Sequence, residues 1–469
     1  ENAPIFAYFG EEGPIDEDLP IIGLLNDNAP RFKALIIYIE HRFYGKSVPF
    51  GTLDEVINNE NTRGYFSSAQ AIADYAEVLV YLKEKLSAKI HRLSSLEDHM
   101  GEVSDSKQLY ASLSFGEFDK SRQSGQAVLP AAVYGGTNLK LDGDSLSLDD
   151  DSAWLLMTTV CSGRRMIDGA LIGFAPGVVR LLTEWLSALR LFDLAGVASG
   201  CDVGELVGEE ASESCYETIR NSWSVIDEVA TRPNGLSFLS QRFKTCSPLD
   251  TSLELKDYLD TMYAVAAQYN HPPTYPVTVV CGSIDGAPDG TDILGRIFAG
   301  VVAYGGERSC YEMKKSNSAS QTNLGWSWQT CSELVMPIGR GSNDTMFPSA
   351  PFSLNDFTNS CMSKYGVPPR PRWVTTYYGS HDIKLVLQRF ASNIIFSNGL
   401  RDPYSSGGVL EKISDSVLPI YTVNGSHCLD ILTSSQGDPQ WLVMQRQVEI
   451  EIIRGWFAKY YADLHALQI

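Results

Sequence analysis

The chain has 469 residues, of which 44% are hydrophobic, and this suffices for one large domain or two ordinary ones. It contains no uninterrupted run of about 18 apolar residues, so we expect no membrane insertion. Asp and Glu number 57 against 37 Lys and Arg, and the resulting net charge of −20 repels nucleic acid and anionic lipid. We therefore exclude nucleic acid as a partner.

The N-terminal part predicts the beginning of an α/β domain. Residues 3–10 (APIFAYFG) and 34–45 (ALIIYIEHRFYG) are expected to form buried strands, because their apolar runs do not alternate with polar residues. Residues 67–86 predict an amphipathic helix, at whose start Ser67 and Gln70 would form a capping box. The predicted order is strand, loop, strand and helix.

The stretch from residue 90 to residue 210 shows no continuous pattern of strands and helices. Residues 114–126 are polar, residues 141–154 are acidic and rich in turn residues, and residues 177–197 are compatible with a lone helix. The acidic run DGDSLSLDDD has Leu146 at its fifth position and no glycine at its sixth, so it does not fit a calcium-binding loop. We predict neither a metal nor a cofactor for this chain.

The C-terminal half divides into a helical stretch and a second strand-rich part. Residues 211–365 are helical by period and contain widely spaced cysteines, which favour disulfides over a zinc site. We interpret them as an insertion that covers the sheet. Residues 393–399 (NIIFSNG) and 418–425 (LPIYTVNG) predict two further strands, and residues 439–461 predict a closing helix.

Asp402 and His427 each follow one of these last two strands. An open α/β sheet places its catalytic groups in loops at the carboxyl ends of parallel strands. In a hydrolase triad of the order Ser, Asp, His, the imidazole takes the serine proton and the carboxylate orients the imidazole. Asp402 and His427 therefore fit the last two members of such a triad.

Five strings of the sequence then identify a family: EHRFYGKSVPFG, SSAQAIADYAEVLVYLK, GWSWQTCSELVMPIG, FSNGLRDPYSSGGV and NGSHCLDIL. Together they resemble the serine carboxypeptidase family of lysosomal Pro-Xaa carboxypeptidase and dipeptidyl peptidase II, in a plant-like version. The resemblance implies an α/β-hydrolase fold with an inserted helical, disulfide-stapled cap, and cleavage next to proline in short peptides. It places Asp402 and His427 on the catalytic Asp and His.

The resemblance also divides the chain into four parts. Residues 1–89 would form the N-terminal part of the hydrolase domain, and residues 90–210 do not match the family. Residues 211–365 would form the cap. Residues 366–469 would complete the hydrolase domain with the Asp and the His.

The catalytic serine of the family lies in G-G-S-Y-G-G, and this motif is missing here. The fragment AAVYGG has Val133 in the place of the serine, and Ser114 and Ser162 lack the glycines that a strained elbow requires. One interpretation is a serine exopeptidase whose nucleophile is still unidentified. The other is an inactive family member or a disrupted gene product that at most binds peptides; an esterase is a third and weaker reading.

Four further residues are candidates for substrate contacts. Gly10 and Glu12 follow the first strand, where a hydrolase supplies an oxyanion-hole amide. Met336 and Tyr404 lie in strings that resemble the family's proline pocket, with Tyr404 in place of the more usual Trp. The sequence leaves open whether the enzyme would act as a carboxypeptidase or as a dipeptidyl peptidase.

The nine cysteines and two sequons favour an oxidising compartment. Asn343 and Asn424 begin the sequons. The resemblance implies the disulfides Cys215–Cys281, Cys246–Cys310 and Cys331–Cys361. Cys161, Cys201 and Cys428 are left over, and we interpret Cys428 as a packed thiol.

The expected partners are short proline-containing peptides, and a homodimer is left open. The expected location is a vacuole or lysosome, or the extracellular space, although the chain carries no signal peptide. It opens without Met, as a processed product or a fragment would.

Overall fold

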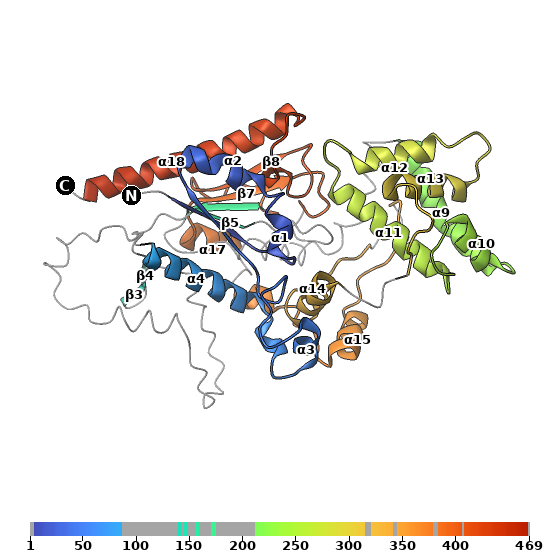
Figure 1. Ribbon diagram of the computed structural model, residues 1–469, viewed down its shortest axis with the longest axis horizontal. Coiled ribbons are helices and arrows are strands. Elements are labelled where there is room, and N and C mark those ends of the chain that lie inside the picture. Colours follow the sequence, from blue (N-terminus) through green and yellow to red (C-terminus); the bar gives the residue numbers. More distant parts are fainter. Residues whose placement is uncertain are drawn as a thin grey trace.

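The structure is a computed structural model, and Figure 1 shows its course. It describes residues 4–86, 139–142, 145–148, 155–158, 170–174, 212–314, 320–340, 345–378, 383–405 and 408–467. The strands are β1 (Ile5–Phe9), β2 (Leu35–Ile39), β3 (Leu139–Asp142), β4 (Ser145–Leu148), β5 (Leu155–Thr158), β6 (Ala170–Phe174), β7 (Ile394–Gly399) and β8 (Val417–Thr422).

The helices of the first part of the chain are α1 (Ile15–Asp18), α2 (Gly23–Phe32), α3 (Leu53–Asn58), the 3-10 turn η1 (Arg63–Tyr65) and α4 (Ser68–Lys85). The middle part contributes α9 (Glu213–Thr231), α10 (Gly235–Arg242), α11 (Ser252–Gln268), α12 (Pro276–Asp285), α13 (Ile293–Gly305), α14 (Gln321–Ser332) and α15 (Leu354–Tyr365). The last part contributes α16 (Trp373–Tyr377), α17 (Ile383–Phe390), the 3-10 turn η5 (Leu429–Ile431) and α18 (Gln440–Leu467).

A six-stranded sheet in the order β2-β1-β5-β6-β7-β8 forms the centre, and β3 and β4 form a separate antiparallel pair. β6 is antiparallel to both of its neighbours, whereas the other pairs are parallel. The carboxyl ends of β1, β2, β5, β7 and β8 therefore meet at one edge of the sheet. The chain is thus of the predicted α/β class, but β5 and β6 come from the stretch for which the sequence predicted no strand.

Helices cover both faces of the sheet, and β1 shows why its sequence is apolar throughout. Phe6 and Tyr8 pack in one core with α2 and α18, whereas Ala7 and Phe9 pack with α4 in another. Because successive side chains point to opposite faces and both faces are buried, polar residues have no place in the strand. Figure 1 shows α2 and α18 along one side of the sheet and α4 on the other.

Two helices, α1 and α2, fill the interval that the sequence predicted as a loop.

The capping box predicted at the start of α4 is wrong. Ser67 is the residue before the helix, but its side chain makes no capping hydrogen bond. Gln70 instead accepts a hydrogen bond from Arg42 at 3.0 Å. The carboxylate of Glu333 takes over the capping role, because its Oε1 accepts from the backbone N–H of Ser68 at 2.8 Å. A residue distant in the sequence therefore replaces the local partner.

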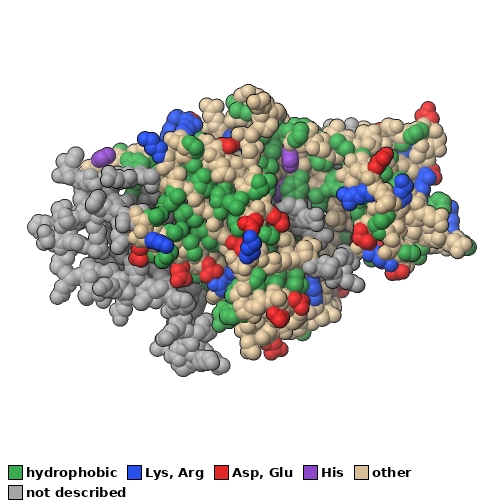
Figure 2. Space-filling model, viewed as in Figure 1, with side chains coloured by type: hydrophobic (Ala, Val, Ile, Leu, Met, Phe, Trp, Pro, Cys, Tyr) green, Lys and Arg blue, Asp and Glu red, His purple; other side chains and the backbone are tan. Residues whose placement is uncertain are grey.

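The helices α9 to α13 form a group with a hydrophobic core of its own, seen beside the sheet in Figure 1. Trp223 on α9 lies in this core, where its Nε1 donates to the carbonyl oxygen of Met346 at 2.7 Å. Figure 2 shows acidic and basic side chains interspersed over the visible surface of this group. Among the residues that the structure describes, no helix is long and apolar enough to cross a membrane.

The structure contains the three disulfides that the resemblance implied: Cys215–Cys281, Cys246–Cys310 and Cys331–Cys361. The first two lie within the helical group, and the third joins α14 to α15. The interpretation of Cys428 as a packed thiol is wrong, because Cys428 is also disulfide-bonded. Its place next to His427 argued only against a nucleophile and did not distinguish a thiol from a half-cystine. Cys161 and Cys201 lie outside the described residues.

Candidate active site

The loops that follow β7 and β8 approach each other through two glycines. A Cβ atom on Gly399 would lie 2.3 Å from the carbonyl carbon of Gly425, and one on Gly425 would lie 2.9 Å from the Cα atom of Gly399. The backbone N–H of Arg401 donates to the carbonyl oxygen of Gly425 at 2.9 Å. Only residues without a side chain permit this contact, which places Asp402 and His427 side by side.

Asp402 and His427 form a buried hydrogen-bonded pair. The Nδ1 atom of His427 lies 2.6 Å from Oδ2 of Asp402, and the two side chains are 1% and 4% exposed. The other carboxylate oxygen, Oδ1, accepts from the backbone N–H of Tyr404 at 3.1 Å. A carboxylate held in this way fixes one tautomer of the imidazole and directs Nε2 away from itself.

The helical group contributes two neighbours of His427 that the sequence analysis missed. The backbone N–H of His427 donates to the carbonyl oxygen of Gln268, the last residue of α11, at 3.0 Å. The ring of Tyr269 meets the imidazole edge-on at a centroid distance of 5.5 Å. Tyr404, which was predicted, lies on the imidazole at 6.3 Å. Gln268 and Tyr269 occur in a helix end without any motif, so no sequence signal pointed to them.

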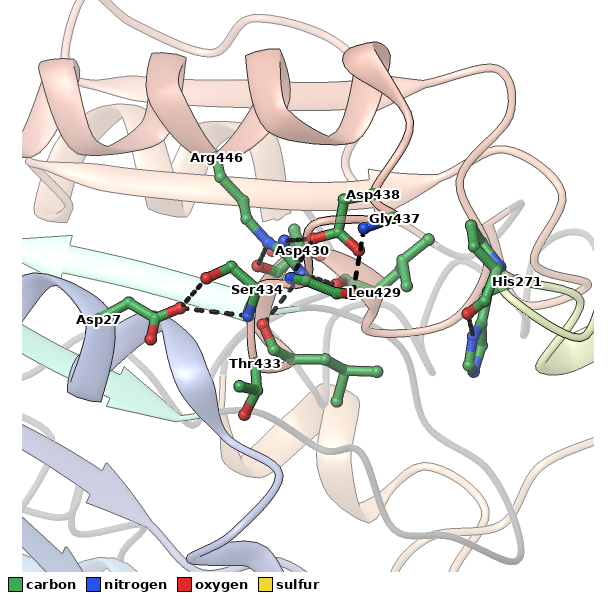
Figure 3. A network of polar contacts seen from close by, with 12 residues as sticks. Asp27, His271, Leu429, Asp430, Thr433, Ser434, Gly437, Asp438 and Arg446 are labelled. Carbon is green, nitrogen blue, oxygen red and sulfur yellow. Dashed lines mark hydrogen bonds and ion pairs between the residues drawn. The ribbon is translucent and has the colours of Figure 1, made fainter.

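The turn after His427 is fastened to α18 by Arg446. Its guanidinium donates to the carbonyl oxygens of Asp430 at 2.6 Å, Leu429 at 3.0 Å and Leu432 at 2.9 Å. Figure 3 shows this side chain reaching from the helix to the turn, with Asp438 on the same guanidinium. Five donors in a rigid fork suit a cluster of carbonyl oxygens, so Arg446 fixes the shape of the turn.

The backbone amide of Gly10, one of the predicted oxyanion-hole positions, is hydrogen-bonded within the sheet. The N–H of Gly10 donates to the carbonyl oxygen of Ile39 at 2.6 Å, and its own carbonyl oxygen accepts from Tyr75 at 2.8 Å. The hydrogen bonding between β1 and β2 continues into this residue, so its N–H already has a backbone partner. Glu12 is buried. Burial of the Tyr44 phenol is the main cause of its raised pKa, and the charge of Glu12 raises that pKa further.

The remaining predicted positions are placed as follows. Met336 is buried in the segment after α14. Asn424 is half-buried, and Ser426, the third residue of its sequon, is 2% exposed. Ser114, Ser162 and Asn343 lie outside the described residues. Within the ranges given above, no three His, Cys, Asp or Glu side chains are arranged to hold a metal ion.

Comparison with known proteins identifies the family of the chain. The profile of the serine carboxypeptidase S28 family matches residues 1–92 and 202–449. The lysosomal Pro-X carboxypeptidase of Bos taurus is 28% identical over 100% of this chain and 83% of its own length, and that of Homo sapiens is 28% identical over 97% and 82%.

More distant relatives include the thymus-specific serine protease of Mus musculus, which is 22% identical over 97% of this chain and 81% of its own length. These matches confirm the predicted class, a serine-type peptidase, and do not favour the inactive alternative. The chain belongs to the serine carboxypeptidase S28 family.

Proposed function

We propose that the chain is a serine exopeptidase that removes a residue following proline from the carboxyl terminus of short peptides. The observation that carries the proposal is the buried pair of Asp402 and His427 at the carboxyl ends of two parallel strands. The names of the similar mammalian proteins, lysosomal Pro-X carboxypeptidases, supply the substrate class. The mammalian relatives also favour a lysosome-like compartment over the extracellular space.

In this mechanism His427 is the general base. Its Nε2 takes the proton of the serine hydroxyl as the oxygen attacks the carbonyl carbon of proline, and then gives it to the amine of the departing residue as the peptide bond breaks. Asp402 stays ionised, holds the Nδ1 tautomer and stabilises the imidazolium. Burial of the pair excludes water and strengthens this charge stabilisation.

The proposed mechanism requires a serine nucleophile, and the two candidates are Ser114 and Ser162. Ser162 comes four positions after Thr158, the last residue of β5. β5 runs parallel to β7 within the sheet order, so its carboxyl end lies at the same edge as Asp402 and His427. A nucleophile on an α/β sheet follows such a strand. We therefore favour Ser162.

The finer fold assignment is also part of the proposal. We infer an α/β-hydrolase fold in which α9 to α13 form a cap over the site. The hydrogen bond from His427 to Gln268 and the ring contact with Tyr269 support it, because both partners come from the helical group. Tyr404 and Met336 would line the proline pocket, and Glu12 would lie at the substrate's reacting end.

The direct test is labelling with a fluorophosphonate probe, followed by mass spectrometry of the modified peptide. The proposal predicts a labelled Ser162, and labelling lost in the His427→Gln variant. A labelled Ser114 would move the nucleophile but keep the mechanism. An unlabelled chain beside a labelled S28 relative would overturn the proposal in favour of an inactive family member.

Asp402→Asn provides the kinetic test. Because the amide cannot hold the reactive tautomer, we expect kcat to fall by about 10³- to 10⁴-fold with little change in KM. The substrates are an amino-blocked Pro-Phe dipeptide and an X-Pro anilide with a free amino terminus. Cleavage of only the second would show a dipeptidyl peptidase, and a loss below tenfold in the variant would contradict the role of Asp402.

A further inference from the structure

Asn-Gly pairs have a reactivity of their own. The nitrogen of the glycine can attack the side-chain amide carbon of the asparagine before it, because no Cβ atom shields that nitrogen. Two of these pairs supply the glycines whose contact places Asp402 beside His427. The chain contains three of them: Asn234-Gly235, Asn398-Gly399 and Asn424-Gly425. Their surroundings differ, and this decides which asparagine can react.

Two of the three asparagines are held in place by regular structure. Asn398 belongs to β7 and is 6% exposed, and its amide group donates to two backbone carbonyl oxygens at 3.4 Å each. Asn234 is exposed, but it immediately precedes α10, where the N–H of Gly235 donates to the carbonyl oxygen of Arg232 at 2.9 Å. Ring closure at either position would require a strand or a helix start to open locally.

Asn424 lies instead in the turn that follows β8. Its neighbour Val423 is 68% exposed, and the Asn424 side chain makes no hydrogen bond with any residue that the structure describes. The N–H of Gly425 donates to the carbonyl oxygen of Thr422 at 3.3 Å, which is longer than a typical N–H···O bond. The turn therefore opposes the approach of the nitrogen to the amide carbon less than a strand or a helix would.

We propose that Asn424 is a site of spontaneous deamidation, and that the isoaspartate formed there separates Asp402 from His427. The nitrogen of Gly425 loses its proton and bonds to the side-chain carbonyl carbon of Asn424, and the amide nitrogen leaves as ammonia. Water then opens the cyclic imide. Opening at the side-chain carbonyl gives aspartate, and opening at the backbone carbonyl gives isoaspartate, in which the main chain runs through the side chain.

The contacts of Gly425 explain why isoaspartate would disturb the site. It adds one methylene group to the main chain just before this glycine, about 1.5 Å of extra length. A Cβ atom on Gly425 would already lie 2.5 Å from the hydroxyl oxygen of Thr422 and 2.9 Å from Cα of Gly399. The carbonyl oxygen of Gly425 also accepts from the N–H of Arg401, which precedes Asp402. The longer turn must therefore move one loop against the other.

Two conditions control the reaction. The nitrogen attacks only after it has lost its proton, so the rate rises with pH, and an acidic compartment would protect the site. The sequon that begins at Asn424 concerns the same atom, because a glycan on the amide nitrogen would hinder its loss. The proposal does not depend on the proposed reaction, since its test needs no turnover.

The test is ageing of the full chain, produced in a bacterial periplasm so that disulfides form and no glycan is attached. After incubation at mildly alkaline pH, peptide mass spectrometry measures deamidation at each Asn-Gly pair, and methylation by an isoaspartyl methyltransferase detects isoaspartate. We expect isoaspartate to form at Asn424 about tenfold faster, or more, than at Asn234 or Asn398, because those two need local opening. At acidic pH we expect little at any of them.

Proton NMR reads the Asp402–His427 pair directly, because an imidazole N–H in so short a hydrogen bond gives a signal far downfield. The signal is assigned by its absence in His427→Gln. Ageing should weaken it in proportion to the isoaspartate at Asn424, whereas Asn424→Gln should retain it. Asn424→Asp, which adds the charge without the methylene, should also retain it. Asn234→Gln is the matched control and should lose the signal as the unaltered protein does.

Equal rates at the three asparagines, or no isoaspartate at Asn424, would overturn the proposed site. Isoaspartate at Asn424 with an undiminished downfield signal would overturn its effect on the pair. If Asn424→Gln does not fold, repair of the aged protein by the methyltransferase decides. A signal that returns with repair supports the proposal, and a signal that stays lost refutes it.

Discussion

At the scale of single residues, the site depends on two glycines, because neither carries a side chain that would separate the loops. An Asn-Gly pair stands shortly before Asp402, and another stands shortly before His427. The structure brings the two glycines, Gly399 and Gly425, into direct backbone contact. A methyl group at either position would occupy space that the other backbone already fills. The Asp–His pair can form at 2.6 Å because these two side chains are missing.

We predict that Gly399→Ala separates the pair. The new Cβ would meet backbone at 2.3 Å, which cannot yield without moving the loop. We expect a loss of about 1–3 kcal/mol in the free energy of unfolding and, where the chain is active, a fall of about 10²-fold in kcat. Urea denaturation and steady-state kinetics measure the two effects.

Gly437→Ala is the control for this variant. A Cβ there would find only the Ser435 hydroxyl, at 3.8 Å, so we expect no loss. Equal behaviour of the two alanine variants would show that the glycine contact does not position the site.

At the scale of elements, the helical group is a unit that the disulfides support. Cys215 on α9 is joined to Cys281 on α12 across 66 residues, and both half-cystines are buried in the group's core. The last residue of α11 then reaches the backbone of His427. Stability of the group therefore bears directly on the geometry of the site.

We predict that replacing Cys215 and Cys281 together by alanine lowers the free energy of unfolding of the helical group by about 2–4 kcal/mol. The reason is that a closed loop of this length restricts the unfolded chain, with an upper bound of roughly 4 kcal/mol from loop entropy. Urea denaturation followed by the fluorescence of Trp223, which lies in the same core, measures the loss. An unchanged denaturation midpoint would contradict the prediction.

At the scale of the whole molecule, buried carboxyl groups couple folding to pH. Burial raises the pKa of Glu333 to about 7, and it likewise raises the pKa of Asp18 to about 7. Between about pH 4 and 7 the folded chain therefore binds more protons at these groups than the unfolded chain. Their contribution to stability is present at acidic pH and is lost as the pH rises through 7. Burial lowers the pKa of His41 to about 4, which contributes in the opposite direction between pH 4 and 6.5.

We predict that Glu333→Gln flattens the pH dependence of stability. The amide imitates the protonated acid and can still accept from the N–H of Ser68. Relative to the unaltered protein, the variant should gain up to about 3 kcal/mol between pH 5 and pH 7.5. Urea denaturation at the two pH values checks this.

The matched control for that measurement is Glu55→Gln. Glu55 is exposed, and its pKa is lowered because its carboxylate accepts hydrogen bonds from the backbone N–H and the hydroxyl of Thr52, so its replacement should give no such gain. A gain as large as that of Glu333→Gln would show that burial is not the cause.

The sequence by itself determined the features that local patterns encode. Apolar runs located β1, β2, β7 and β8. Burial on both faces explains the runs of β1 and β7, whereas β2 and β8 lie at the edges of the sheet and are only partly buried. The order of Asp402 and His427 after two such strands predicted their pairing, and specific strings identified the family. The same reasoning failed for β5 and β6, whose surroundings show no regular period.

Only the tertiary structure decided which distant groups meet. Glu333 replaces a local cap on α4, Gln268 and Tyr269 reach His427 from the helical group, and the amide of Gly10 is consumed by β2. These contacts join residues that are far apart along the chain or lie on different strands, so no periodicity or motif records them. They are set by the packing of whole elements, in which each buried polar group must find a partner wherever the fold places one.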